Sequence, residues 1–190
     1  KSHEIIERLP QIENLIDKGY EVLYCTDEVD DFMIRIMRDY KDKEFKSAAG
    51  GDLGIEGSDE EKKAFEEKLE SSKDMLVKMK DLLGGRVKEV RISQRLKNNP
   101  VCLAVDGDVS LEMERVLNSM PIQEKAEAQK ILEINAEHKV FDALKSTFES
   151  GDEDKLRIYT SLLYEQAMLI SGIMVEDAVA FSNYVCDLMK

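Results

Sequence analysis

Hydrophobic and polar residues follow a helical period through much of the chain, most clearly between residues 58 and 85. The residues on one face recur every three or four positions, as on a packed helix; they are Phe65, Leu69, Ser72, Leu76, Met79 and Leu83. The run 58–61 (SDEE) matches a capping box, in which serine and glutamate satisfy free backbone amides. Gly84 and Gly85 suit a helix end. This segment is therefore predicted to be one long helix.

The first part of the chain predicts short elements of both kinds. Residues 3–17 have helical spacing with Pro10 as a break, because proline lacks the amide hydrogen that a helix interior needs. Residues 20–24 (YEVLY) predict a short buried strand, residues 29–40 a helix with one apolar face, and residues 44–47 a second short strand. This order of elements indicates a small α/β unit.

A glycine-rich segment follows this unit. Four of the ten glycines fall within residues 48–57 (AAGGDLGIEG), which predicts a flexible linker and a domain boundary. We therefore expect two parts, residues 1–57 and residues 58–190.

The second part predicts a mixed domain. Residues 87–93 alternate in polarity and residues 101–105 (VCLAV) are apolar throughout, so the turn signal at 97–100 between them predicts a hairpin. Residues 131–134 predict a third strand, and helices are expected over 110–120 and 137–150. The predicted fold class is α+β: a small α/β unit, then a domain of helices and a three-stranded sheet that ends in two helices.

These last two helices, over residues 153–171 and 175–190, each have two apolar stripes. In the first helix the stripes are Leu156, Tyr159, Leu163, Gln166, Ile170 and Ile173, and Ile158, Leu162 and Leu169. In the second they are Ala178, Phe181, Val185 and Leu188, and Val175, Val179, Cys186 and Met189. Two apolar faces exceed what one small domain usually covers, which favours a homodimer through a two-fold four-helix bundle. The alternative is that all the stripes are buried within one protomer.

Charge narrows the possible partners. The chain has 27 Lys and Arg against 40 Asp and Glu, a formal net charge of -13, so its surface repels nucleic acid and anionic membranes. The most basic stretch, residues 86–97, has strand alternation and is better explained as a solvated strand face. No apolar run approaches the roughly 20 residues that span a bilayer. We therefore expect neither nucleic acid nor a membrane as a partner.

The sequence contains no recognisable catalytic or metal-binding motif. Cys25, Cys102 and Cys186 are scattered, which favours buried thiols in a reducing compartment, and the two histidines are far apart without a zinc motif. The acidic run at residues 27–31 suits a helix start. The glycines lack the Lys-Ser/Thr of a phosphate loop. We predict no catalytic residues and no metal site, although an enzyme assembled from dispersed residues stays open.

Five segments carry a family resemblance. They are residues 18–32 (KGYEVLYCTDEVDDF), 93–96 (SQRL) with 100–103 (PVCL), 113–115 (MER), 131–138 (ILEINAEH), and 163–167 (LYEQA) with 169–172 (LISG). In this order and spacing the chain resembles the end of the middle domain and the C-terminal dimerisation domain of the ninety-kilodalton heat-shock chaperones. Glu28 and Ala136 stand where family members often have proline, which changes only local turns.

The resemblance implies a division of labour in a longer protein. ATP and Mg would bind in an N-terminal domain upstream, and a catalytic arginine would come from a middle-domain loop, so this part would be no enzyme and hold no cofactor. Because the chain starts at Lys1 rather than Met, we expect a piece of a longer cytoplasmic protein. It stops at Lys190 without the acidic tail of eukaryotic members, which favours the bacterial branch and predicts that co-chaperones that read the tail do not bind.

The resemblance also assigns two sets of residues. The expected dimer interface comprises Ile158, Leu162, Leu163, Gln166, Ala167, Ile170, Ala178, Phe181, Val185 and Leu188. A short Met-rich helix is expected to contact unfolded or partly folded client proteins through Leu111, Met113, Val116, Leu117 and Met120. The alternative for that helix is that its apolar stripe packs on the sheet. The chain would then be a plain helical dimerisation domain without client contact.

Overall fold

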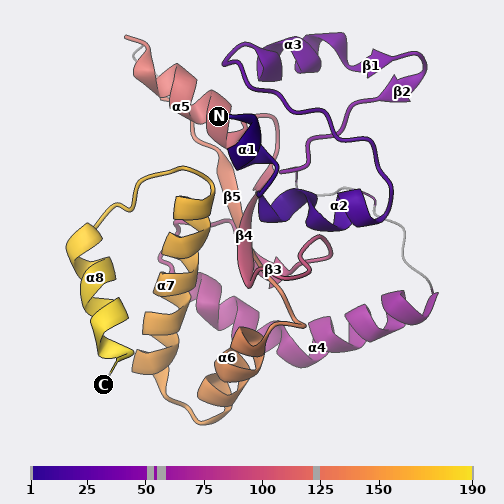
Figure 1. The fold of residues 1–190 in the computed structure, drawn as a ribbon. Helices are drawn as coiled ribbons and strands as arrows, with labels where there is room; N and C mark the ends of the chain where they lie inside the picture. Colours follow the sequence, from indigo (N-terminus) through magenta and orange to yellow (C-terminus); the bar gives the residue numbers. More distant parts are fainter. Residues whose placement is uncertain (1, 51–53, 55–58, 122–124, 190) are drawn as a thin grey trace.

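A three-stranded mixed sheet lies at the centre of the computed structural model, which describes residues 2–50, 54, 59–121 and 125–189, with only the backbone of Glu61 (Figure 1). The strands are β3 (Glu89–Ile92), β4 (Val101–Asp106) and β5 (Gln129–Ile134), in the order β3-β5-β4. β5 runs parallel to β3 and antiparallel to β4, with Leu132 opposite Val90 and Leu103. The predicted hairpin is wrong, because β5 lies between the two strands that it would join. As the central strand, β5 has its backbone paired on both sides.

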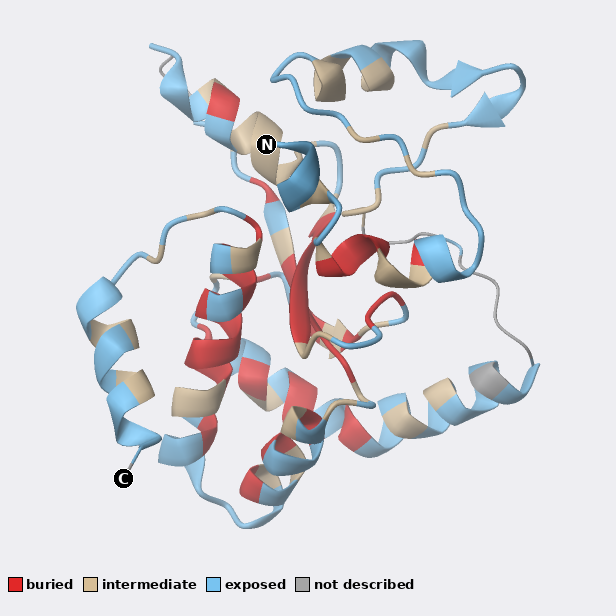
Figure 2. Cartoon of the chain, in the orientation of Figure 1, coloured by how far each residue is buried: buried red, intermediate tan, exposed pale blue. Residues whose placement is uncertain are grey.

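One face of the sheet carries the main core. Alternation along the three strands points six apolar side chains to this face: Val90, Ile92, Val101, Leu103, Leu132 and Ile134. Three helices complete the core: α4 (Asp59–Leu82), α6 (Lys139–Glu149) and α7 (Glu153–Ile170). The buried residues concentrate where these helices meet the sheet (Figure 2).

The long predicted helix is confirmed as α4, whose fully buried residues lie in its second half. Ser72, Leu76, Met79 and Leu83 are buried, whereas Leu69 is 38% exposed. The first half of α4 extends beyond the sheet (Figure 1), and of the described residues there only Phe65 is packed, partly buried, against the core. The predicted capping serine at position 58 lies outside the described residues.

The N-terminal part differs from the predicted α/β unit. It consists of α1 (His3–Ile6), the 3-10 helix η1 (Pro10–Ile12), α2 (Glu13–Asp17), α3 (Asp30–Met37) and a hairpin of β1 (Asp39–Tyr40) and β2 (Lys43–Glu44). The break at Pro10 is confirmed. The predicted buried strand at 20–24 is wrong: these residues have no regular structure, and Leu23 is 57% exposed. No strand in the described residues lies alongside to pair with this segment.

The start of the predicted linker is held on the sheet. The Val105 amide on β4 donates a hydrogen bond to the Ala49 carbonyl at 2.8 Å, and Gly50 forms a parallel bridge with Val105. The Arg95 guanidinium donates to the carbonyls of Ala48 and Gly50. Residues 48–50 therefore cover the outer edge of β4, which would otherwise expose unpaired backbone groups.

The remaining helices are α5 (Leu111–Ser119) and α8 (Ala178–Asp187). Their first turns are capped by Ser110, whose Oγ accepts from the Met113 amide, and by Asp177, which accepts from Val179 and Ala180. α8 therefore begins three residues later than predicted. It lies along α7 at one side of the molecule, and α5 leaves the sheet at the end away from α6 (Figure 1). No helix in the described part is long and apolar enough to cross a membrane.

Candidate functional site

Helix α7 is largely buried within the protomer. Three residues of the expected dimer interface, Leu162, Leu163 and Ala167, are 3%, 5% and 0% exposed. In this conformation they have no surface left for a partner. Gln166 is exposed, and Ile158 and Ile170 are half-buried, so a narrow strip of α7 stays open. Leu169, which is 47% exposed, belongs to this strip but not to the expected interface.

Helix α8 has an inner and an outer side. None of its residues, all of which are described, is buried. Phe181 and Val185 are half-buried against α7, while Ala178 and Leu188 are exposed. The outer side carries the stripe of Val179, Cys186 and Met189, with Val179 at 72% and Met189 at 79% exposure. The expected interface omitted this second stripe, although the sequence pattern contains it.

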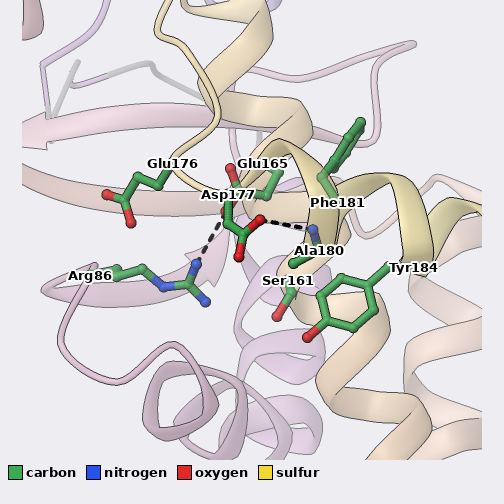
Figure 3. A pocket seen from close by; sticks show the side chains of 8 residues that line it. All are labelled: Arg86, Ser161, Glu165, Glu176, Asp177, Ala180, Phe181 and Tyr184. Carbon is green, nitrogen blue, oxygen red and sulfur yellow. Dashed lines mark hydrogen bonds and ion pairs between the residues drawn. The ribbon is translucent and has the colours of Figure 1, made fainter.

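A small cavity of about 120 Å³ separates α7 from the start of α8. Figure 3 shows the Arg86 guanidinium pointing toward Glu165 and Asp177, with Phe181 and Tyr184 projecting from α8. Arg86 donates a hydrogen bond to Glu165 Oε1 at 3.2 Å, and its guanidinium lies 4.9 Å from the centre of the Tyr164 ring. The cavity is too small for a substrate of ordinary size.

Burial and like charges shift the pKa values of Glu165 in this cavity and of its chain neighbour Tyr164. Burial raises the pKa of Glu165, and the carboxylates of Glu176 and Asp177 raise it further, against the opposing effect of Arg86. Burial, followed by the charge of Glu176, raises the pKa of Tyr164 to about 12. Glu165 is therefore protonated more readily than an exposed glutamate.

Helix α5 is neither fully exposed nor fully buried. Val116 is buried, Leu111, Met113 and Leu117 are half-buried, and Met120 is 47% exposed. Helix α3 lies beside α5, and two polar contacts join the segments: Arg115 pairs with Glu28 at 2.8 Å, and Ser110 contacts Asp31. The five predicted client-contact residues thus lie on one helix, but only its C-terminal end presents a large apolar side chain to solvent.

The second face of the sheet holds a buried charge cluster that the sequence patterns did not indicate. Glu133 on β5 is 1% exposed, and its carboxylate accepts from Arg91, Ser93 and Arg95, with the Arg95 Nε at 2.8 Å. Arg95 is itself 3% exposed. The cluster lies beneath the N-terminal part, where Gln11 donates to the Leu103 carbonyl at 3.1 Å.

The thiols differ from the expectation that all three are buried. Cys102 is buried beside Glu133, and burial followed by that charge raises its pKa well above the ordinary value. Cys25 and Cys186 are exposed, because they lie on the irregular segment before α3 and on the outer side of α8. Among the described residues, no three metal-binding side chains converge.

Comparison with known proteins places the chain in a family. The pattern of the family described as "Hsp90 protein" matches residues 1–190, and the chain belongs to this family. Similar curated proteins include "Chaperone protein HtpG" of Clostridium botulinum (strain Langeland), 53% identical over 190 residues, and the protein of the same name in Bacillus subtilis (strain 168), 50% identical over 188 residues. These alignments cover 100% and 99% of this chain but 30% of each relative.

Proposed function

We propose that this chain is the dimerisation and client-contact part of an ATP-dependent molecular chaperone. Its membership of the Hsp90 family and its identity to proteins named "Chaperone protein HtpG" support a role in protein folding. The observation that carries the dimerisation role is that apolar side chains are exposed both on the outer side of α8 and on the open strip of α7. In the longer protein, ATP and Mg would bind upstream, and this part would contribute no catalytic residue. The protein would act in the cytoplasm.

The proposed boundary lies after residue 57. Residues 1–57 would be the end of the middle domain and residues 58–190 the C-terminal domain. The contacts of Ala48 to Gly50 with β4 and of Gln11 with Leu103 fit an arrangement in which the two domains touch closely at their junction.

A second copy of the chain is the proposed partner of α7 and α8. Met174, Val179 and Met189 are 86%, 72% and 79% exposed, and large apolar side chains on one helix and directly before and after it mark an interaction surface. Pairing about a two-fold axis would use the same surface twice and form a four-helix bundle. Of the expected interface residues, the proposal keeps Ile158, Gln166, Ile170, Ala178, Phe181, Val185 and Leu188, and it adds Leu169, Val179 and Met189.

The solution mass of the chain tests the dimer. We expect a mass near twice 21.7 kDa that persists on dilution, measured by analytical ultracentrifugation. Burial of a few hundred Å² of apolar surface stabilises the dimer by several kcal/mol at roughly 25 cal/mol per Å². This energy determines the dissociation constant, and the dilution series has to span that concentration. A mass of 21.7 kDa at every concentration would contradict the dimer.

Helix α5 is the proposed client contact, because methionine side chains adapt to many apolar surfaces. The double variant Met113→Ser with Met120→Ser should bind a reduced and alkylated unfolded protein about tenfold more weakly without changing the mass of the dimer. Val77→Ser, at an exposed position on α4, is the matched control and should bind normally. Equal affinity of the double variant and the control would favour the alternative, a plain dimerisation domain without client contact.

A further inference from the structure

We propose that Glu165 is a pH-sensitive latch that controls how firmly α8 is held on α7. This inference rests on the proposed function, because α8 supplies much of the proposed dimer surface. Glu165 lies on the buried side of α7, and its side chain is 8% exposed. Arg86 donates to its Oε1, but its Oε2 is buried and has no hydrogen-bond partner within the described part of the chain. One carboxylate oxygen, Oε1, therefore accepts a hydrogen bond, and the other, Oε2, accepts none from any described residue.

The charged groups around Glu165 come from every element that meets at the cavity. Arg86 reaches it from the connection between α4 and β3, and Tyr164 is its neighbour on α7. Glu176 and Asp177 come from the segment that leads into α8, and Tyr184 comes from α8 itself. Three carboxylates thus face one guanidinium (Figure 3). Two of the three are on the part that has to dock.

Few apolar contacts oppose this repulsion. α8 packs mainly on α7, and none of its residues is buried. Helices with little buried surface open locally at low free-energy cost. A change of one charge in the shared cavity should therefore alter how often α8 opens.

Protonation changes the balance in a defined direction. At neutral pH an ionised Glu165 shares the cavity with the carboxylates of Glu176 and Asp177, and repulsion among the three charges opposes the docking of α8. A proton on Oε2 removes one of these charges and adds a donor that can reach a neighbouring carboxylate. Because the pKa of Glu165 is raised in the folded state, its stabilising contribution is complete below the ordinary value of 4.5 and is lost as pH rises through the folded pKa. Mild acid should therefore tighten α8, and neutral pH should loosen it.

Amide hydrogen exchange of α8 tests the latch on the whole chain. The variant Glu165→Gln keeps the shape of the side chain and supplies a donor at the position of the acid proton. At pH 7.5 its α8 amides should exchange roughly two- to tenfold more slowly than those of the unaltered chain, and the difference should shrink as the pH is lowered toward the ordinary pKa of 4.5. Both proteins are compared at the same pH, so that their intrinsic exchange rates are equal. The concentration is chosen so that both have the same oligomeric state, and dimerisation therefore does not contribute to the difference.

Two further variants make the result decisive. Glu176→Gln, which removes a like charge without touching the pair of Arg86 and Glu165, should also slow exchange at pH 7.5. Glu149→Gln, at an exposed position on α6, has the same change in charge and should leave α8 unaffected.

Faster exchange in Glu165→Gln would mean that the attraction of Arg86 dominates, and it would overturn the latch. If the chain is a dimer and α8 exchanges at the unaltered rate in both Glu165→Gln and Glu176→Gln, the latch is overturned and the proposed function stands. If the chain is a monomer and α8 exchanges as expected, the latch stands and the proposed dimerisation is overturned.

Discussion

The double variant Val179→Glu with Met189→Glu should sediment as a monomer at concentrations where the unaltered chain is a dimer. Val179 lies on the outer side of α8 and Met189 directly after the helix, so pairing through this surface would bury two unpaired carboxylates from each protomer in an apolar interface. An unpaired charge in such a place costs several kcal/mol. The dissociation constant should rise by at least about a hundredfold, which sedimentation over a dilution series can measure.

The fold of the protomer should survive these changes. Val179 and Met189 are largely exposed, so the melting temperature of the monomer should stay close to that of the unaltered chain. Val77→Glu on α4 is the control, since it adds a charge at a 54% exposed apolar position that is outside the proposed interface, and it should remain dimeric. If the double variant pairs as tightly as this control, the outer side of α8 does not form the interface.

The variant Glu133→Leu should lose roughly 3–5 kcal/mol of its free energy of unfolding, because it leaves the buried guanidinium of Arg95 without a counter-charge. Urea unfolding followed by circular dichroism measures this loss. The hydrogen bonds of Arg95 to the carbonyls of Ala48 and Gly50 depend on the orientation of the guanidinium. We therefore also expect the Val105 amide, which bonds to Ala49, to exchange faster.

Two controls separate the buried cluster from an ordinary surface pair. Glu137 forms an ion pair with Lys68 in which both side chains are exposed, so Glu137→Leu should change the free energy of unfolding by less than about 1 kcal/mol. The double variant Arg95→Leu with Glu133→Leu should lose less than the sum of the two single variants, because no unpaired charge remains between them. Equal losses for Glu133→Leu and Glu137→Leu would show that the cluster contributes little to stability.

Local patterns were reliable where a residue's environment follows from its neighbours in the chain. The stripe from Ser72 to Leu83 predicted the packed half of α4, and the rigid ring of Pro10 predicted the break before η1. They failed where partners come from distant segments. The run YEVLY has strand propensity but no strand beside it, and residues 101–105 pair with β5 rather than with the strand before them.

The candidate site divides in the same way. Helical spacing found both apolar stripes of α8, yet it could not tell which one would face α7, because both have the same period. Leu162, Leu163 and Ala167 were predicted at a partner surface; in the protomer they are buried, whereas Gln166 and Leu169 on the same helix are exposed. The structure places Phe181 and Val185 against α7 and thereby shows that the stripe with Val179 and Met189 is the exposed one.

The sequence by itself determined the long helix α4, most of α7 and the family, since these depend on spacing along the chain and on motifs in a fixed order. Only the tertiary structure decided the strand order, the burial of Glu133 and the unsatisfied half of Glu165. A strand places alternate residues on opposite faces, but what covers each face depends on distant parts of the chain. The second face of this sheet is covered by the N-terminal part, and that is why a glutamate could be buried at a position where alternation alone predicts a solvated residue.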